Sequence, residues 1–241
     1  MVFRQKMKMC LPALTAVVFA TTAVPALAAT GFYVGATAGE SLFHQNKGDF
    51  DAAIIEGFNN LAYSTEIASS SLDKTHFAFG ALVGYRVTPK FSIEAGYTDL
   101  GKLTYKSSGQ LTLIQNPLFT STETANVKSS AKGPTLAALG ILPISTDWEI
   151  YGRAGLFFSK VTVDASTTLI HLGPGVNAQA IDSASANSVD PLISAGAAWH
   201  VVDHVTLRAE YTRFVNVGDK DKTGEMNVDL FNLGVTYSFK Y

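Results

Sequence analysis

The sequence predicts an all-β fold: an eight-stranded antiparallel up-and-down β-barrel that spans a membrane. Three observations predict it. Segments of about ten residues alternate between apolar and polar side chains, as a lipid-facing barrel strand requires. The connections between these segments alternate between short and long. Charged residues make up only 16% of the 241 residues, against about 25% in an average soluble domain.

The N-terminal segment has the features of a secretory signal peptide, which we place at residues 1–28. Basic residues at its start precede an apolar stretch, and the segment ends at Ala28 in a small-x-small cleavage pattern. An uncleaved membrane anchor is the alternative, but proline and threonine interrupt the stretch. Cleavage leaves 15 basic and 20 acidic residues in 29–241, a net charge of −5. That charge disfavours nucleic acid as a partner.

Cysteine usage points to the compartment. The single cysteine, Cys10, lies inside the predicted signal peptide, so the mature chain has none. An exported protein without disulfides must close its fold by other means, and we expect it in the outer membrane of a Gram-negative bacterium. A soluble periplasmic β-barrel that binds a ligand is the alternative, and it would fractionate without detergent.

The last predicted strand has the clearest pattern. Its alternate positions carry the apolar side chains of Phe231, Leu233, Val235, Tyr237, Phe239 and Tyr241, and the residues between them are polar or small. A strand of a soluble sandwich can alternate in the same way. Eleven residues that end on an aromatic side chain at the chain terminus favour a lipid-facing strand.

Seven further strands precede it. We place them, in chain order, at residues 32–39, 77–87, 91–98, 131–142, 150–158, 191–202 and 205–212. The sixth of these is apolar on both faces, so the sequence does not assign its inward and outward positions.

The connections between the strands differ systematically. Short turns are predicted near Thr88, Ser145 and Asp203, and four long external loops at 41–74, 107–130, 164–190 and 215–225. Outer-membrane barrels have tight periplasmic turns and long external loops, whereas four such loops are uncommon in a compact soluble domain. Eight strands leave too little chain for a sixteen-stranded porin.

The first long loop contains a predicted surface helix. Apolar residues recur there at helical spacing, at Phe50, Ile54, Phe58 and Leu61, and Asp49 stands where an N-cap would lie. The apolar side either packs against the loop itself or forms a patch that contacts a partner.

Several segments together resemble the OmpA-type transmembrane domain, in the same order across nearly the whole mature chain. The matching segments are 84–89, 91–97, 100–101, 139–140, 143–144, 150–155, 207–211, 217–219 and 233–239. The resemblance implies an eight-stranded barrel with little room inside. It also implies contacts with outer-membrane lipid and lipopolysaccharide, and a C-terminal strand that the barrel-assembly machinery reads. The best-known members of this family carry a periplasmic peptidoglycan-binding domain after the barrel, and we expect none here.

Four charged residues point into the lumen by strand phase: Glu94, Arg153, Arg208 and Glu210. Two acids and two guanidiniums in a narrow barrel should pair, because an unpaired buried charge is very costly. One interpretation is a salt-bridge network that fills the barrel. The alternative is a gate for a small ion path, since charged rings control passage in pores.

The resembled family also implies which charges pair. There, an inward Glu of the third strand pairs with an inward Arg of the seventh, and Glu94 and Arg208 match this pair. A Lys of the fourth strand and a Glu of the sixth offer alternative partners. Ala138 or a neighbour stands at the first of these positions, and Trp199 near the second. We therefore expect no partner-switching gate, and a mostly closed barrel with at most a small conductance.

The histidines do not predict an enzyme. The five are His44, His76, His171, His200 and His204, and none has the His-x-Ser context of the outer-membrane lipid A deacylases. The turn between the last two does not give the helical spacing of a zinc site, and interfacial positions suit such rings. We expect no catalytic residue, cofactor or metal. The predicted role is a structural barrel that presents its loops, with a small gated pore or a loop-based adhesin or receptor as alternatives.

Overall fold

The computed structural model describes residues 30–60, 63–115, 120–171 and 178–239. The predicted signal peptide, Leu61 and Tyr241 lie outside these residues, and cleavage after Ala28 stays a prediction. The described chain folds into one helix and nine strands: β1 (Gly31–His44), α1 (Lys47–Asn59), β2 (Tyr63–Asp73), β3 (Thr75–Thr88), β4 (Phe91–Leu113), β5 (Thr120–Pro143), β6 (Trp148–His171), β7 (Ala178–Val202), β8 (Val205–Val217) and β9 (Met226–Ser238).

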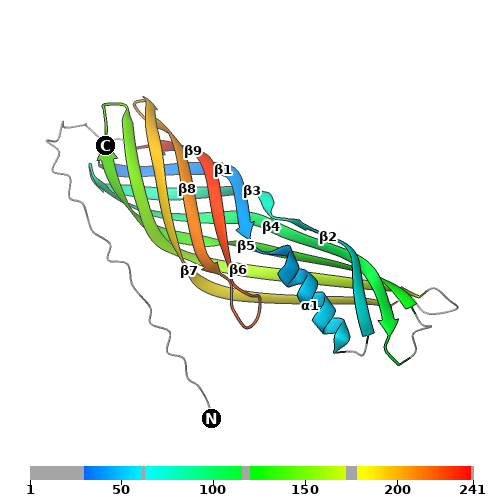
Figure 1. The fold of residues 1–241 in the computed structure, drawn as a ribbon. Helices are drawn as coiled ribbons and strands as arrows, with labels where there is room; N and C mark the ends of the chain where they lie inside the picture. The colour runs from blue at the N-terminus through cyan, green and yellow to red at the C-terminus, as the bar shows by residue number, and fades with distance from the viewer. Residues whose placement is uncertain (1–29, 61–62, 116–119, 172–177, 240–241) are drawn as a thin grey trace, which may run out of the picture.

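Eight of these strands close into an antiparallel barrel, which confirms the predicted fold class (Figure 1). The eight are β1 and β3 to β9, and each pairs with the next of these eight along the chain. The ring is completed where β1 pairs with β9 and β4 with β5. Closure satisfies the backbone N–H and C=O groups that an open sheet would leave at its edges. β2 is additional. It pairs with residues 104–113 of β4, on the same edge of β4 on which β3 pairs with residues 91–99.

Strands β4 to β7 run well beyond the ring, to lengths of 23 to 25 residues. Most of two predicted loops, 107–130 and 164–190, is therefore strand. Because β1, β8 and β9 end earlier, this part is an open sheet made of β2 and the far halves of β4–β7, which we call the extension (Figure 1). Its threonine-rich strands suit a half-exposed sheet surface.

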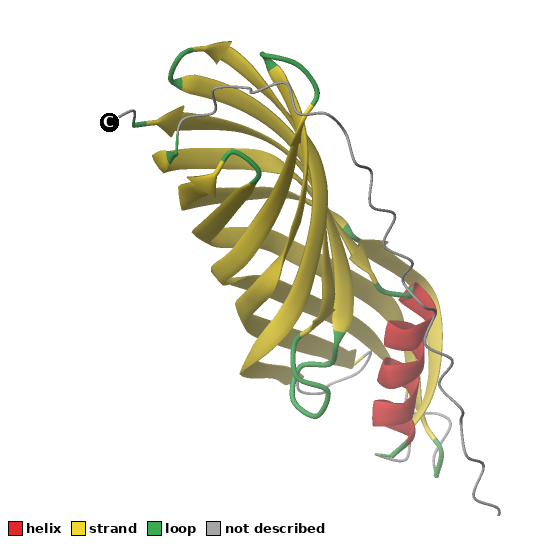
Figure 2. Cartoon of the chain, turned by 90° about the vertical axis from the view of Figure 1, so that its left-hand side faces the viewer, coloured by secondary structure: helices red, strands yellow, loops and turns green. Residues whose placement is uncertain are grey.

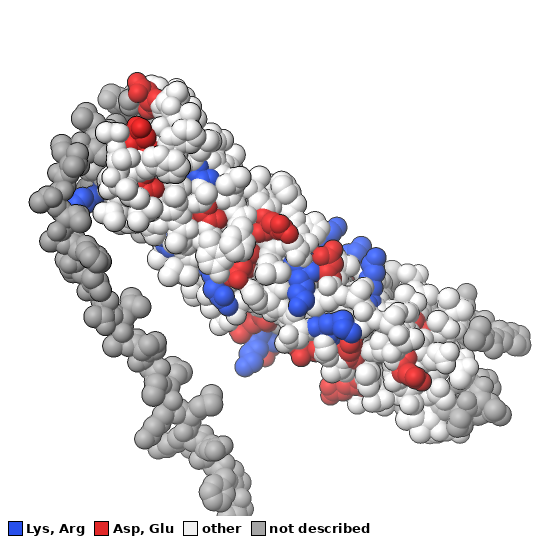
Figure 3. Space-filling view, turned by 45° about the horizontal axis from the view of Figure 1, so that its top comes forward, with Lys and Arg blue, Asp and Glu red and all other residues white. Residues whose placement is uncertain are grey.

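The ring has an apolar outer face and a mixed inner one. On β9 and directly after it, the side chains of Phe231, Leu233, Val235, Tyr237 and Phe239 point outward and are 44 to 70% exposed. β7 has Leu192, Ser194 and His200 inward and Ile193 and Trp199 outward, which supplies the phase that the sequence left open. Most of the surface in Figure 3 is uncharged, and Lys and Arg side chains gather over the middle of the molecule's length.

A bulge in β4 marks the change from ring to extension. The pairing of β4 with β5 shifts between Asp99 and Lys102. Gly101 lies there with φ of 76°, a backbone conformation that glycine adopts most readily. Its N–H donates to Oδ1 of Asp99 at 2.8 Å.

Helix α1 packs against the extension, mainly on β2 (Figure 2). It begins after Asn46, one turn earlier than predicted, so Asp49 lies in the first turn and the predicted cap at Asp49 is wrong. The ring of Phe50 stacks on Tyr105 of β4, with 5.0 Å between centroids. The Tyr105 hydroxyl donates to Asp51 at 2.6 Å. No helix in the described residues is long and apolar enough to cross a membrane.

Candidate functional site in the barrel lumen

The four predicted lumen charges meet across the inside of the ring, and we call them the lumen network. Arg208 of β8 lies between two carboxylates: its Nη1 is 2.5 Å from Oε1 of Glu94, and its Nη2 is 3.0 Å from Oε2 of Glu210. Arg153 of β6 is 2.8 Å from Glu210 and 3.9 Å from Glu94. Each cation thus faces both anions.

Two tyrosines add hydrogen bonds to this network, although Oε2 of Glu94 and Nε of Arg153 are buried without a hydrogen-bond partner. Tyr33 of β1 donates to Glu94 at 2.9 Å, and Tyr151 of β6 donates to Glu210 at 2.9 Å. The Tyr151 hydroxyl also accepts from Nε of Arg208 at 3.1 Å, and the guanidinium carbon lies 4.5 Å from the Tyr151 ring centroid. A buried ion pair is tolerated when such extra bonds satisfy its remaining donors and acceptors.

The sequence did not assign these tyrosines to the network. The signal was available, because Tyr33 and Tyr151 share the inward phase of their strands. At the two positions matched to the family's alternative partners, the lumen-facing residues are neighbours of Trp199 and Ala138. Trp199 points outward, where it stacks on Trp148 at 5.7 Å, and its neighbours Ala198 and His200 face the lumen. Ala138 is also outward, and Ala137 is buried instead.

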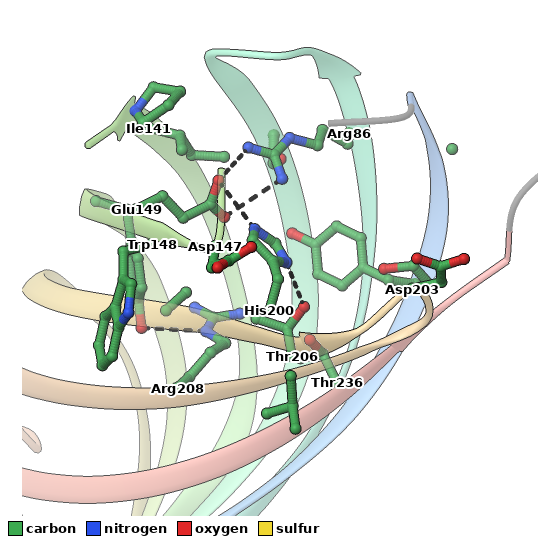
Figure 4. A pocket seen from close by; sticks show the side chains of 18 of the residues that line it. Arg86, Ile141, Asp147, Trp148, Glu149, His200, Asp203, Thr206, Arg208 and Thr236 are labelled. Atoms are coloured by element: carbon green, nitrogen blue, oxygen red, sulfur yellow. Dashed lines mark hydrogen bonds and ion pairs between the residues drawn. The ribbon is translucent and has the colours of Figure 1, made fainter. Parts of the chain in front are cut away.

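A second charged cluster lies at the mouth of the barrel near the short turns. Arg86 of β3 is 2.7 Å from Glu149 of β6, and Nε2 of His200 is 3.5 Å from the same carboxylate. Nδ1 of His200 is 2.8 Å from Oγ1 of Thr206. These side chains line a cavity of about 450 Å³ that ends at Tyr151 and Arg208 (Figure 4). The sequence did not assign Arg86 and Glu149 to the lumen.

On the other side of the network the lumen becomes apolar. Phe157, Leu192, Phe214 and Leu230 are at most 5% exposed, and we call them the apolar layer. The rings of Phe157 and Phe214 lie 4.9 Å apart at 60°, a favourable tilted contact. A space of about 30 Å³ separates the network from this layer, which is room for about one or two water molecules.

The remaining predicted histidines lie near the ends of the ring. His44 is 2.6 Å from Asp229, and Nδ1 of His204 is 2.9 Å from the carbonyl oxygen of Ser238. Nδ1 of His76 lies 3.4 Å from a backbone carbonyl, and the His171 side chain is outside the described part. Within that part, no three His, Cys, Asp or Glu side chains are grouped as metal ligands would be.

Comparison with known proteins decides the family. The model of the OmpA-like transmembrane domain matches residues 27–241. The chain belongs to this family. Outer membrane protein A of Serratia marcescens is 27% identical over 222 residues, which are 92% of this chain and 53% of that protein. The protein of the same name from Klebsiella pneumoniae is 29% identical over 161 residues, 66% of this chain and 40% of that one.

The chain therefore spans about half the length of the curated relatives it matches. Among solved structures, the fold resembles Neisserial surface protein A, with 15% identity, 88% of this chain and 99% of that one covered, and a TM-score of 0.43. This OmpA-like barrel is an outer-membrane protein. In the usual orientation of such barrels the short turns face the periplasm and the longer excursions face outward, which predicts that the extension and α1 are extracellular.

Proposed function

We propose that this OmpA-like barrel is a closed, non-enzymatic structural element of the outer membrane that presents its extension at the cell surface. The observation that carries the proposal is the filling of the lumen. The charged network and the apolar layer occupy successive levels of the barrel, separated by a space of about 30 Å³. An ion that crossed the lumen would have to displace both the charged network and the apolar layer.

The two levels oppose ions in different ways. At the network, each arginine faces two carboxylates, so a passing ion must separate pairs that have little water to replace their partners. At the apolar layer, an ion meets Phe157 and Phe214, whose side chains offer no ligand. For an ion, moving out of water is very costly in free energy when no new ligand replaces the water. Either level is a barrier, and they act in series.

The test is single-channel recording in planar bilayers with the refolded mature protein, after heat-shifted gel mobility has confirmed folding. We expect silence from the wild type. We also expect silence from Glu94→Ala and Arg208→Ala, because the apolar layer remains. Glu40→Ala, which removes an outward acid at the far end of β1, is the matched control. Discrete wild-type openings that change in the two lumen variants, and not in the control, would overturn the proposal in favour of a gated pore.

The extension supports surface recognition as a second candidate function. It continues beyond the membrane-spanning ring and carries α1 on its side (Figure 2). A loop-based adhesin or receptor would bind host or environmental molecules there. Cell binding should then survive Glu94→Ala and be lost when residues 46–60 are replaced by a short linker. Equal binding after that replacement would remove α1 from this function.

For assembly, we propose that the outward row from Phe231 on β9 to Phe239 just after it is read by the barrel-assembly machinery. Tyr241 continues the sequence pattern and lies outside the described residues. The support is the unbroken run of five exposed apolar side chains at alternate positions. Replacing Tyr237 and Phe239 by serine should slow assembly in cells. The matched change on the opposite face, Thr236→Ala with Ser238→Ala, should not. Equal slowing by both pairs would contradict this role.

A further inference from the structure

The cavity at the mouth of the barrel is lined by two buried hydrogen-bond donors that no described residue satisfies. They are Nε of Arg86 and the hydroxyl of Ser92, and both residues line the cavity of about 450 Å³. Ser92 is 1% exposed, and the Arg86 side chain is 11% exposed. A buried donor without a partner costs stability, and a ligand that carries an acceptor group would satisfy both donors.

The strand register places these two donors side by side. Arg86 of β3 stands directly opposite Ser92 of β4, and both line the same cavity. Side chains on one face of an antiparallel pair begin about 5 Å apart when their residues are directly opposite. At that spacing the two oxygens of one carboxylate can accept from both donors.

Glu149 leaves the Nε edge of the Arg86 guanidinium unused. It accepts from the other two nitrogens, from Nη1 at 3.3 Å and from Nη2 at 2.7 Å. Nη2 also donates to the carbonyl oxygen of Pro89 at 3.0 Å. The charges of Arg86 and Glu149 therefore cancel while one donor remains, so an incoming carboxylate meets a neutral pair that can still donate a hydrogen bond.

The rim of the cavity is acidic. Asp147 and Asp203 lie in the two short turns that precede β6 and β8, and both line the cavity (Figure 4). Asp147 comes two residues before Glu149, and two residues span up to about 7 Å. Because Glu149 is 2.7 Å from Arg86, Asp147 lies up to about this distance outside the level of the two donors. A cationic group of a ligand is favoured at the rim.

One wall between the donors and the rim is apolar. Leu139 and Ile141 of β5 and Ala198 of β7 are at most 8% exposed and line the same cavity. Apolar walls with a few convergent polar groups are typical of small-molecule sites, whose volumes are about 300–1,000 Å³. The cavity therefore suits a ligand that has apolar side chains between an anionic end and a cationic end.

We propose that this cavity binds a short peptide with free termini, about two residues long. The α-carboxylate accepts from Nε of Arg86 and from the Ser92 hydroxyl, small apolar side chains lie against Leu139 and Ile141, and the α-ammonium lies near Asp147. Two extended residues span about 7 Å, which matches the depth between the donors and the rim. The site is on the short-turn side of the lumen network, so binding requires no passage through the network and conductance does not test it.

The experiment is equilibrium dialysis of radiolabelled alanyl-alanine against the refolded mature protein in detergent micelles. Ser92→Ala removes one donor, and Arg86→Lys keeps a cation beside Glu149 but removes the Nε donor. Each variant loses a hydrogen bond to a charged group, so we expect about tenfold weaker binding in each. Ser107→Ala is the matched control and should bind as the wild type, because Ser107 is also a buried, unbonded serine of β4 but lies in the extension. Heat-shifted mobility confirms that each barrel is folded.

Three further ligands test the assignment of the two ends. N-acetylated alanyl-alanine lacks the ammonium, and alanyl-alanine amide lacks the carboxylate, so both should compete poorly with the labelled dipeptide. Acetate should not compete at concentrations at which unlabelled alanyl-alanine does. No binding to the wild type, equal loss in Ser107→Ala, or unchanged binding in both Ser92→Ala and Arg86→Lys would overturn the proposal. Competition by acetate as strong as that by the dipeptide would also overturn it, because the site would then recognise any small anion.

Discussion

Arg208 and Glu94 lie 114 residues apart in the chain and 2.5 Å apart in space. They project from β8 and β4, which do not pair with each other, so the ion pair crosses the lumen. Backbone pairing alone would hold these two walls only through the intervening strands. The pair adds a direct connection inside a lumen with little room for water, where its partners cannot be replaced by solvent at low cost.

Substitution of Glu94 alone should therefore lower the free energy of unfolding more than substitution of both Glu94 and Arg208. Glu94→Gln leaves Arg208 with Glu210 as its remaining carboxylate partner. We expect a loss of about 3 kcal/mol in the free energy of unfolding, the low end for a broken buried pair, because Glu210 stays in place. Urea titration with heat-shifted mobility as the readout measures it in lipid vesicles.

The double variant Glu94→Gln with Arg208→Met provides the control. It removes the buried cation together with its partner, so no charge is left uncompensated. We expect it to be more stable than Glu94→Gln alone. Equal or additive losses would show that the two side chains do not act as a pair.

The apolar layer can be tested with two consecutive phenylalanines on opposite faces of β6. Phe157 is 0% exposed inside the barrel, and Phe158 is 41% exposed on the outer wall. Phe157→Ala loses the burial of the ring and also leaves a cavity, for a cost of about 4 kcal/mol. Phe158→Ala leaves a gap that lipid fills, so it should cost about 2 kcal/mol. Similar losses in the two variants would mean that the layer is loosely packed.

The ring strands could be predicted because lipid imposes a strong contrast between their two faces. Phe231 and Leu233 alternate with Asn232 and Gly234 on β9, and this period of two also fixed the inward phase of Arg208. The four charges of the lumen network followed from phase, since opposite charges on the inward face of a narrow ring are expected to pair, whereas their bonds to Tyr33 and Tyr151 were not predicted.

The extension could not be predicted because the same contrast is missing there. On β4 the outward Ser108 and Gln110 flank an inward Gly109, and on β5 the outward Thr122 flanks the inward Glu123. Water lies on the outer side instead of lipid, so neither face has to be strongly apolar. A polar segment of this kind is indistinguishable by periodicity from a loop.

Glu123 is an unusual member of the extension. Its side chain is fully buried, and neither carboxylate oxygen has a hydrogen-bond partner. Burial raises the pKa of Glu123 above its ordinary 4.5. The folded state therefore favours the protonated acid, and ionisation removes stability as the pH rises from 4.5 through the raised pKa.

Glu123→Gln should consequently stabilise the extension at pH 8 and change little at pH 4. An unbonded buried amide costs less than an unbonded buried carboxylate, so we expect a gain of about 1 kcal/mol. Hydrogen exchange of β5 amides at the two pH values, corrected for intrinsic rates, measures it. Glu66→Gln, an exposed acid on β2, is the control. A loss of protection in Glu123→Gln at pH 8 would show that the carboxylate has a stabilising partner.

The contact of α1 with the extension should depend on pH through Tyr105 and Asp51. Burial raises the pKa of Tyr105 from its ordinary 10.0 to about 12, so its contribution is complete below pH 10 and is lost as the pH rises toward 12. The hydrogen bond from Tyr105 lowers the pKa of Asp51 below 3.8, so that contribution is complete above pH 3.8 and is lost as the pH falls further. α1 should stay docked between these limits.

A spin label on Ala53→Cys, on the exposed side of α1, reports this docking, since Cys10 is the only natural cysteine and lies in the predicted signal peptide. We expect low label mobility from pH 5 to 9 and a rise between pH 10 and 12. Tyr105→Phe keeps the stacking on Phe50 and loses the hydrogen bond, worth roughly 1 kcal/mol at this partly buried site. Its label should be more mobile at pH 7 and have no alkaline transition of this origin. Tyr63→Phe on β2 should behave as the wild type. An unchanged alkaline transition in Tyr105→Phe would mean that another group releases the helix.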